Sequence, residues 1–308
     1  MLSVKNLSIE FSRYGSARRR TIIHPVRDLS LDIGDGEIVA VVGSSGSGKS
    51  LLAHAVLGLL PGNARTSGEI LFKGTPLTSA SMAALRGRAI ALIPQSVAYL
   101  NPLSRVGRQV YRASRLSGKC RATAARSTDR AFARYRLDES VKSLFPFQVS
   151  GGMARRVLTA TATAGDADLL IADEPTTGLD PVVARQSLSH LRELADLGKA
   201  VMLITHDIDA AVTVADRVAV IYAGTTVELT PARNFADGAL RHPYSRALWN
   251  ALPQQGFGFV PGNQPMEDDA VNGCIYLDRC PDRTGECRCA QPLRPVGKGH
   301  VRCCHAQG

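Results

Sequence analysis

The chain has 308 residues, of which 44% are hydrophobic and 21% charged, with a formal net charge of +10. Global disorder is excluded, since apolar residues are plentiful enough to bury a core. The best apolar stretch, residues 51–60, is half as long as the ~20 residues of a membrane-spanning helix. The first residues show no secretory signal pattern. We expect a soluble, cytosolic protein with two units, or one large domain with appendages.

The positive charge is concentrated in residues 105–136. This segment holds ten basic side chains and a single acid, Asp129, so it carries +9 and the rest of the chain is about neutral. We interpret the segment as the solvated face of a helical region, with contact to anionic lipid or an acidic partner as the alternative. Base-specific nucleic-acid binding is not expected, since few aromatic residues accompany the charge.

Strand and helix patterns alternate along the first 225 residues. Short apolar runs bounded by Gly, Asp or Pro predict buried strands at 37–42, 89–93, 169–172, 200–204 and 218–222. Helical spacing of apolar residues marks 50–59 and 182–197. Residues 3–11 and 26–33 alternate like an antiparallel β layer. This order predicts an α/β domain.

Two segments depart from this pattern. Residues 96–147 lack good strand candidates and are rich in Ala, Arg and Ser, which predicts a helical insertion. After Arg241 the chain continues with a short helix, a Pro- and Gly-rich linker at 253–273, and a cysteine-rich tail. We therefore place one domain at 1–240, with a helical subdomain at about 96–165, and a C-terminal extension at 241–308.

A glycine-rich phosphate loop is the strongest functional motif. Residues 43–50 fit the pattern G-x-x-x-x-G-K-[ST] after a predicted strand and before a predicted helix, the context that the motif requires. Their backbone N–H groups and the helix N-terminus would cradle phosphate oxygens, Lys49 would reach the β- and γ-phosphates, and Ser50 would bind Mg²⁺. The candidate ATP-binding residues are Gly43, Ser44, Ser45, Gly46, Ser47, Gly48, Lys49 and Ser50.

Two adjacent carboxylates follow the predicted strand at 169–172. The carboxyl edge of a parallel sheet is where ligands bind in doubly wound folds. Asp173 would join the Mg²⁺ shell, and Glu174 would polarise a water molecule for attack on the γ-phosphate.

Further motifs occur in a fixed order around these two. They are Gln95 after a predicted strand, Ser150, Gly151 and Gly152 beyond the helical insertion, Asp180 shortly after the carboxylates, and His206 after another strand. With the phosphate loop they resemble an ATP-binding subunit of an ABC transporter over residues 1–240. The resemblance implies a P-loop ABC-type ATPase fold with a RecA-like α/β core, an antiparallel β layer and a helical subdomain.

The resemblance also implies a role for each motif. Ser150, Gly151 and Gly152 match the signature loop, which caps the γ-phosphate of ATP held by the partner subunit. Gln95 matches the loop that touches Mg²⁺ and the attacking water, and His206 matches the switch histidine at the γ-phosphate. Asp180 matches the loop that couples the two ATP sites of the dimer.

One residue departs from the family pattern, and one role has two candidates. Arg155 stands where many members of the family have Gln after the signature. Members of the family stack an aromatic residue of the N-terminal β layer on adenine. Tyr14 is our candidate for that role, with Phe11 as the second choice.

Three features resemble the oligopeptide, dipeptide and nickel importer branch of the family. They are Leu-Asn-Pro at 100–102, His-Pro-Tyr at 242–244, and a tail with cysteines at 274, 280, 287 and 304. Some members of that branch hold a [4Fe–4S] cluster in this tail. Independently of the family, four thiolates brought together by an irregular tail can hold a cluster that staples a segment too small to have its own core. Cys274, Cys280, Cys287 and Cys304 are the candidate ligands. Zinc and a metal-free tail remain alternatives.

The sequence thus predicts the ATP-hydrolysing subunit of a prokaryotic importer, peripheral on the cytoplasmic face of the inner membrane. The implied partners are a homologous ATPase subunit, expected to be a different chain, two transmembrane permease subunits and an extracytoplasmic substrate-binding protein. The cargo is a di- or oligopeptide, or alternatively nickel or a metal chelate. The alternative from another class is a soluble ABC-type ATPase that acts on nucleic acid or ribosomes.

Overall fold

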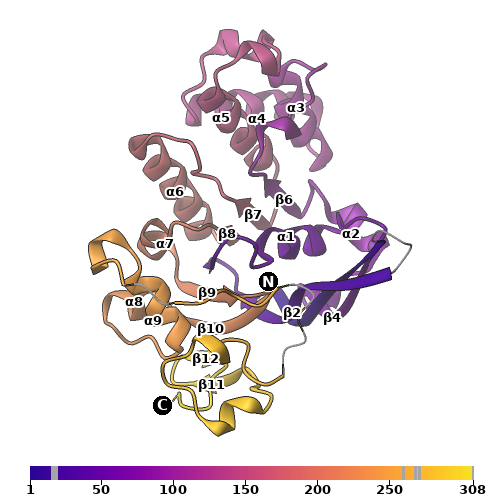
Figure 1. The fold of residues 1–308 in the computed structure, drawn as a ribbon. Helices are drawn as coiled ribbons and strands as arrows, with labels where there is room; N and C mark the ends of the chain where they lie inside the picture. Colours follow the sequence, from indigo (N-terminus) through magenta and orange to yellow (C-terminus); the bar gives the residue numbers. More distant parts are fainter. Residues whose placement is uncertain (15–19, 259–260, 267–268, 270–271, 307–308) are drawn as a thin grey trace. The chain divides into compact units, whose positions relative to one another are not determined.

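The structure, a computed structural model, describes residues 1–14, 20–258, 261–266, 269 and 272–306, without the side chains of residues 13, 14 and 20 (Figure 1). The chain divides into two compact units. Unit 1 comprises Met1–Gly34, Ile38–Leu77 and Ile204–Gly308, and unit 2 comprises Asp35–Glu37 and Thr78–Leu203.

Unit 1 contains an antiparallel sheet with the strand order β2-β1-β4-β5. Its strands are β1 (Leu2–Tyr14), β2 (Arg20–Ile33), β4 (Ala64–Phe72) and β5 (Thr75–Pro76). In β1, Leu2, Val4, Leu7 and Ile9 are buried, so the two-residue period of a strand with one face on a core holds on each side of a register shift between Val4 and Leu7. The antiparallel β layer predicted from residues 3–11 and 26–33 is confirmed.

The second sheet of unit 1 has the order β11-β12-β10-β9-β3. Its strands are β3 (Ile38–Val42), β9 (Arg217–Tyr222), β10 (Thr225–Pro231), β11 (Arg294–Val296) and β12 (Gly299–Val301). β3 and β9 are parallel, and the other neighbours are antiparallel. The cysteine-rich tail therefore adds the hairpin of β11 and β12 to the sheet that contains β3. The sequence of the tail did not predict these strands.

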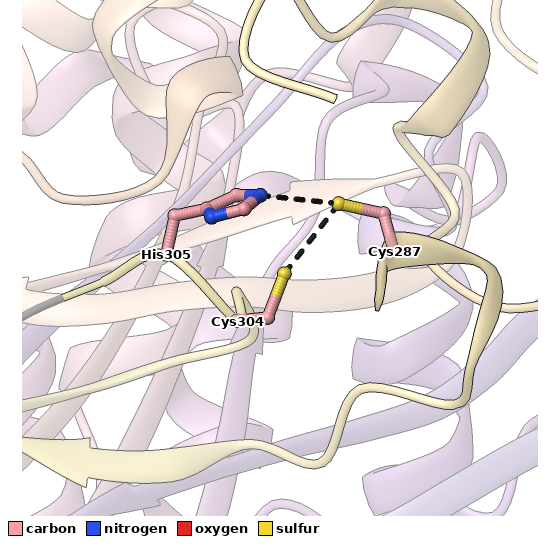
Figure 2. A group of neighbouring side chains, drawn as sticks. All are labelled: Cys287, Cys304 and His305. Atoms are coloured by element: carbon pink, nitrogen blue, oxygen red, sulfur yellow. Dashed lines mark hydrogen bonds between the residues drawn. The ribbon is translucent and has the colours of Figure 1, made fainter. Parts of the chain in front are cut away.

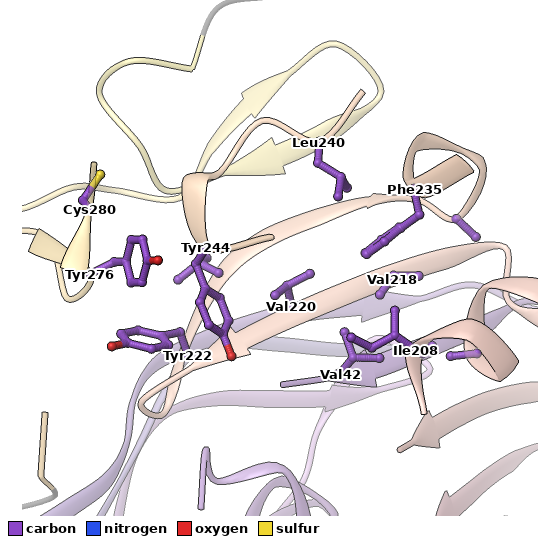
Figure 3. Packing of buried hydrophobic residues seen from close by; sticks show 14 residues of the cluster. Val42, Ile208, Val218, Val220, Tyr222, Phe235, Leu240, Tyr244, Tyr276 and Cys280 are labelled. Carbon is purple, nitrogen blue, oxygen red and sulfur yellow. The ribbon is translucent and has the colours of Figure 1, made fainter. Parts of the chain in front are cut away.

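The α-helices of unit 1 among the described residues are α1 (Lys49–Leu57), α7 (Ile208–Val214), α8 (Arg233–Ala236) and α9 (Pro243–Asn250). An apolar cluster joins the inner residues of β3, β9 and β10 to α7, α8 and α9 and to the tail (Figure 3). Within the cluster the rings of Tyr222, Tyr244 and Tyr276 pack against one another, and each is at most 5% exposed.

Unit 2 contains strands β6 (Ile90–Ile93), β7 (Leu169–Asp173) and β8 (Ala200–Ile204), in the order β8-β7-β6. β6 and β7 are parallel. Every residue of β7 and β8 is buried, which explains their continuous apolar sequence. Helices α2 (Ser79–Leu85) and α6 (Pro181–Asp196) also belong to this unit.

The helical insertion is formed by α3 (Val106–Leu116), α4 (Arg121–Arg134) and α5 (Gly151–Thr163) (Figure 1). Val110, Phe132 and Val157 lie in a shared apolar core of these helices. Nine of the ten basic residues of 105–136 are exposed, as both a solvated face and a contact with anionic lipid or an acidic partner require. Short 3-10 helices complete the chain at Val97–Tyr99, Glu139–Ser143, Pro146–Gln148, Pro253–Gln255, Leu277–Arg279 and Gly285–Arg288. Among the described residues, no helix is both long and apolar enough to cross a membrane.

Candidate nucleotide-binding site

The phosphate loop connects β3 to α1 in unit 1 and depends on glycine at two positions. A Cβ on Gly43 would lie 2.2 Å from the carbonyl oxygen of Ile221. Gly48, the N-cap of α1, has φ of 87° in the left-handed region, and a Cβ there would lie 2.8 Å from the carbonyl oxygen of Pro25. Neighbouring backbone therefore leaves no room for a side chain where the loop begins and ends.

The ammonium group of Lys49 lies inside this loop. Its Nζ donates to the carbonyl oxygens of Gly43 (2.9 Å) and Ser44 (2.8 Å) and lies 3.2 Å from Ser47 Oγ. Lys49 is 8% exposed, whereas Ser45 and Gly46 at the loop tip are exposed. A buried cation at a helix N-terminus, next to an exposed Gly- and Ser-rich loop tip, is suited to bind an anion.

The two carboxylates lie at the end of β7 in unit 2. Asp173 is 5% exposed and Glu174 is 8% exposed. Glu174 has φ of 50°, a left-handed conformation that non-glycine residues adopt at a cost and that is common at functional sites. The Thr177 hydroxyl donates to Glu174 Oε2 at 3.1 Å, which orients the carboxylate. The carboxylate of Asp173 and the hydroxyl of Ser50 are oxygen donors of the kind that Mg²⁺ prefers.

Two other predicted site residues are helix N-caps in unit 2. Ser150 caps α5 and accepts a hydrogen bond from the N–H of Met153 at 3.3 Å. The first residues of α5, Gly151 and Gly152, carry no side chains that would cover its N-terminus. Asp180 caps α6 and accepts from Val182 and from the next residue, both at 3.1 Å. The signature loop thus ends in an accessible helix N-terminus, as its predicted role requires.

Arg155 connects two of the unit 2 motifs. Its Nη1 donates to the carbonyl oxygen of Gln95 at 3.2 Å, and its Nη2 lies 3.7 Å from where a Cβ of Gly178 would stand. The residue that departs from the family pattern therefore bridges the loop of Gln95 and the loop before Asp180. The sequence flagged Arg155 but not this contact.

The remaining predicted residues are placed as follows. His206 is exposed in unit 1 after β8, next to Thr205, whose hydroxyl accepts from the N–H of Asp207. Phe11 is half-buried on β1. Tyr14 ends β1, and its side chain lies outside the described residues. The structure brings together residues 43–50 within unit 1, and the carboxylates, Gln95 and the signature loop lie in unit 2.

The phosphate loop also meets residues that the sequence did not assign to it. The N–H of Ser44 donates to the hydroxyl oxygen of Tyr244 at 3.3 Å, and the Ser44 hydroxyl donates to Oε1 of Gln264 at 2.9 Å. Both partners belong to the C-terminal extension. Because they are 200 and 220 residues away from Ser44 in the chain, no local sequence signal could have found them.

The cysteine-rich tail brings three potential metal ligands together (Figure 2). Sγ of Cys287 lies 3.4 Å from Sγ of Cys304 and 3.4 Å from Nε2 of His305. Among the described residues these three form a group whose ligand atoms all lie within 4.8 Å of one another. Cys274 and Cys280, the other two predicted ligands, stand outside this group. His305 was missed, although the Cys-His pair at 304–305 was its signal.

The thiols of the tail influence one another's protonation. Burial raises the pKa of Cys280 to about 11, and the nearby thiols of Cys274 and Cys287 add to the effect. Burial also tends to raise the pKa of Cys287, but hydrogen bonds from the Thr284 N–H and with Cys304 lower it to about 7. Thiols within electrostatic reach of one another, one of them readily ionised, suit a thiolate-ligated iron–sulfur cluster or zinc ion.

Two family models match the chain. The model described as "ABC transporter" matches residues 26–177, and that described as "Oligopeptide/dipeptide transporter, C-terminal region" matches residues 227–287. The second match covers the His-Pro-Tyr segment and part of the cysteine-rich tail.

Curated proteins resemble the chain over nearly its whole length. A probable peptide ABC transporter ATP-binding protein of Sinorhizobium fredii is 36% identical, with 99% of this chain and 94% of that protein covered. The oligopeptide transport ATP-binding protein OppD of Escherichia coli is 35% identical, with 99% and 92% covered. A solved dimeric ATP-binding cassette, bound to ADP and phosphate after hydrolysis, matches with a TM-score of 0.67 and 25% identity, with 76% of this chain and 99% of that chain covered.

Proposed function

Because the chain belongs to the ABC transporter family and is an ATPase with the C-terminal region of oligopeptide and dipeptide transporters, we propose that it energises peptide uptake through separate transmembrane subunits. The observation that carries this proposal is the phosphate loop, with buried Lys49 inside it, in a chain similar along its length to peptide-transport ATP-binding proteins.

In this proposal, the phosphate loop and Lys49 bind the phosphates of ATP. Ser50 and Asp173 would hold Mg²⁺, which when bound neutralises charge on the β- and γ-phosphates. Glu174, held by Thr177, accepts a proton from the water that attacks the γ-phosphate. His206 contacts the γ-phosphate, and its exposure leaves it accessible to nucleotide.

The same proposal assigns the exposed motifs of unit 2 to the partner subunit. The N-terminus of α5, capped by Ser150, would face the γ-phosphate of ATP held by a second, different ATPase subunit. Asp180 would couple the two sites. Gln95, whose carbonyl is held by Arg155, would sense the transmembrane subunits. ATP binding would close the dimer, and hydrolysis would reopen it.

We also propose where the chain binds the membrane and what the transporter carries. The chain would bind two permease subunits at the cytoplasmic face of a prokaryotic cell membrane. An extracytoplasmic binding protein would deliver the cargo to those permeases. Peptide is the favoured cargo, since the relatives are named for peptide or oligopeptide transport. Nickel or a metal chelate is the alternative, because an ATPase subunit does not contact the cargo.

The partners are tested by purifying the tagged chain from gently solubilised native membranes, with an untagged strain as control. Mass spectrometry should identify a second ATPase, two multi-span permeases and an extracytoplasmic receptor. The receptor is then assayed for binding of peptides and of nickel. Recovery of ribosomal or DNA-bound proteins without a permease would refute the transport assignment and leave the ATPase standing.

Coupling is tested by ATP hydrolysis in reconstituted liposomes. The co-purified permeases and loaded receptor should stimulate turnover by the chain. Stimulation by nucleic acid, and not by permease and receptor, would support the alternative ATPase class and contradict the proposal.

A [4Fe–4S] cluster in the tail is a further part of the proposal. Cys274, Cys280, Cys287 and Cys304 would hold it, and it would staple a segment whose own apolar cluster has four buried residues. Iron, sulfide and zinc are measured on anaerobically purified protein. Cys287→Ser should lose the metal, whereas Cys289→Ser, at an exposed cysteine, is the matched control. Zinc without iron would identify the alternative centre, and no metal would refute both.

A further inference from the structure

The C-terminal extension forms hydrogen bonds with Ser44 of the phosphate loop. Ser44 donates its backbone N–H to Tyr244 (3.3 Å) and its hydroxyl to Gln264 (2.9 Å). These two bonds engage both polar groups of Ser44 that can donate. The next two residues, Ser45 and Gly46 at the loop tip, are exposed.

Tyr244 is held firmly in position. The imidazole Nδ1 of His242 accepts from the Tyr244 N–H at 3.0 Å and caps α9, and Pro243 occupies the first position of that helix. The Tyr244 ring lies 4.4 Å from the ring of Tyr222 and 5.4 Å from that of Tyr276, measured between centroids (Figure 3). The His-Pro-Tyr segment thus holds the Tyr244 hydroxyl within hydrogen-bond distance of Ser44 in the phosphate loop.

Gln264 reaches the loop from the segment after α9. Its Nε2 lies 3.7 Å from the Cβ position of Gly46, so the side chain spans the loop from Ser44 to Gly46. Arg27 of β2 anchors the same segment by donating to the carbonyl oxygens of Met266 (3.2 Å) and Asp269 (2.8 Å). A second anchor, Arg279 in the tail, donates to the carbonyl oxygen of Pro261 at 3.2 Å.

We propose that Tyr244 and Gln264 are positioning residues for ATP binding, through which the C-terminal extension orders the phosphate loop before nucleotide arrives. A loop of Gly and Ser loses more conformational freedom on binding than a stiffer segment does. Bonds that hold its first turn in the free protein reduce that loss and increase affinity. Since neither side chain is among the cradling groups, the effect is on binding more than on the chemical step. The inference rests on ATP binding at the phosphate loop.

The first test compares Tyr244→Phe with wild type by titrating a fluorescent ATP analogue and Mg²⁺ into the full-length chain. Phe keeps the ring packing and removes the hydroxyl, so we expect about two- to tenfold weaker binding, the range for one hydrogen bond. The matched control is Tyr276→Phe, whose hydroxyl is buried without a hydrogen-bond partner among the described residues, and which should bind like wild type. Unchanged or tighter binding by Tyr244→Phe would overturn the proposal.

The second test is a double-mutant cycle of Ser44→Ala and Gln264→Ala. Since both changes remove the same hydrogen bond, their effects on affinity should not add. In ATPase assays Gln264→Ala should raise KM and leave kcat within about twofold, because chemistry is spared. A fall in kcat at unchanged KM, or additive effects on affinity, would contradict positioning of the loop.

The Lys49→Ala variant distinguishes failure of the proposed ATP site from failure of the positioning role of Tyr244 and Gln264. If wild type binds the analogue and Lys49→Ala does not, the phosphate loop is the ATP site. In that case, an unchanged affinity of Tyr244→Phe for the analogue would refute only this inference. If wild type itself does not bind the analogue, the proposed ATP site fails first.

Discussion

Replacing His242 by Asn should weaken the dependence of stability on pH below neutrality. His242 is 1% exposed, and its Nδ1 must be unprotonated to accept from the N–H of Tyr244. Burial, together with the positive charges of Arg246 and Arg302, lowers the pKa of His242 from 6.5 to about 3. Asn cannot take up a proton, yet its oxygen still caps a helix N-terminus well.

The sign of the effect follows from proton uptake. Between pH 6.5 and about 3 the unfolded chain binds a proton on His242 that the native chain does not bind. Stability is therefore full above pH 6.5 and falls as pH is lowered, by about 1.4 kcal/mol per pH unit. At about pH 5 the loss from this one group is about 2 kcal/mol. Burial raises the pKa of neighbouring Glu228, so that carboxyl acts in the opposite sense, losing stability as pH rises above 4.5.

The assay is urea unfolding of wild type and His242→Asn at about pH 7.5 and about pH 5. The difference between the two proteins isolates the histidine, since Glu228 is present in both. We expect the wild type to lose about 2 kcal/mol more than the variant on acidification. Equal losses in the two proteins would refute the reasoning that buried, neutral His242 makes the fold sensitive to acid.

Three further substitutions test the ATP site. Lys49→Ala should abolish measurable nucleotide binding in a titration, because it removes the ammonium inside the loop; unchanged affinity would contradict its assignment. Glu174→Gln should retain ATP binding and trap the closed dimer, with turnover reduced by a factor on the order of 10²–10⁴; normal turnover would exclude it as the base. Gly43→Ala places a Cβ 2.2 Å from the carbonyl oxygen of Ile221, so thermal unfolding should reveal a loss of about 1–3 kcal/mol; wild-type stability would show that the loop can shift.

Local patterns predicted many of the elements correctly. The strand predicted at 218–222 is β9, and the helix predicted at 182–197 is α6, each within a few residues. These predictions succeeded because an apolar run or a 3.6-residue period reports directly on the face that is buried. The signature Ser150 likewise caps a helix that begins at the next residue, as its sequence context predicted.

The errors concern pairings between distant segments. β10 was not predicted as a strand, although all but its last residue are buried between β9 and the tail. The hairpin of β11 and β12 pairs with β10 across some seventy residues of chain. Strand pairing at such separations leaves no periodic signal in the short segments themselves, because a three-residue strand is stabilised by its neighbour more than by its own composition.

The cysteine-rich tail shows the same limit at the level of a site. The resemblance placed Cys287 and Cys304 together among the four candidate ligands, and their Sγ atoms are 3.4 Å apart. It did not mark His305, because a histidine next to a cysteine has no fixed direction until the chain around it folds. Assignment of the metal itself stays a prediction.

The sequence by itself predicted the phosphate loop, because phosphate binding needs glycines, a lysine and a hydroxyl at fixed local spacing, and a strand–loop–helix unit supplies that spacing without help from distant residues. The order of the further motifs around this loop carried the resemblance to ATP-binding subunits of ABC transporters. Only the tertiary structure revealed that Tyr244 and Gln264 hold Ser44 of that loop. A hydrogen bond between residues 200 positions apart depends on how β9, β10 and α9 pack together, and that packing is a property of the whole core.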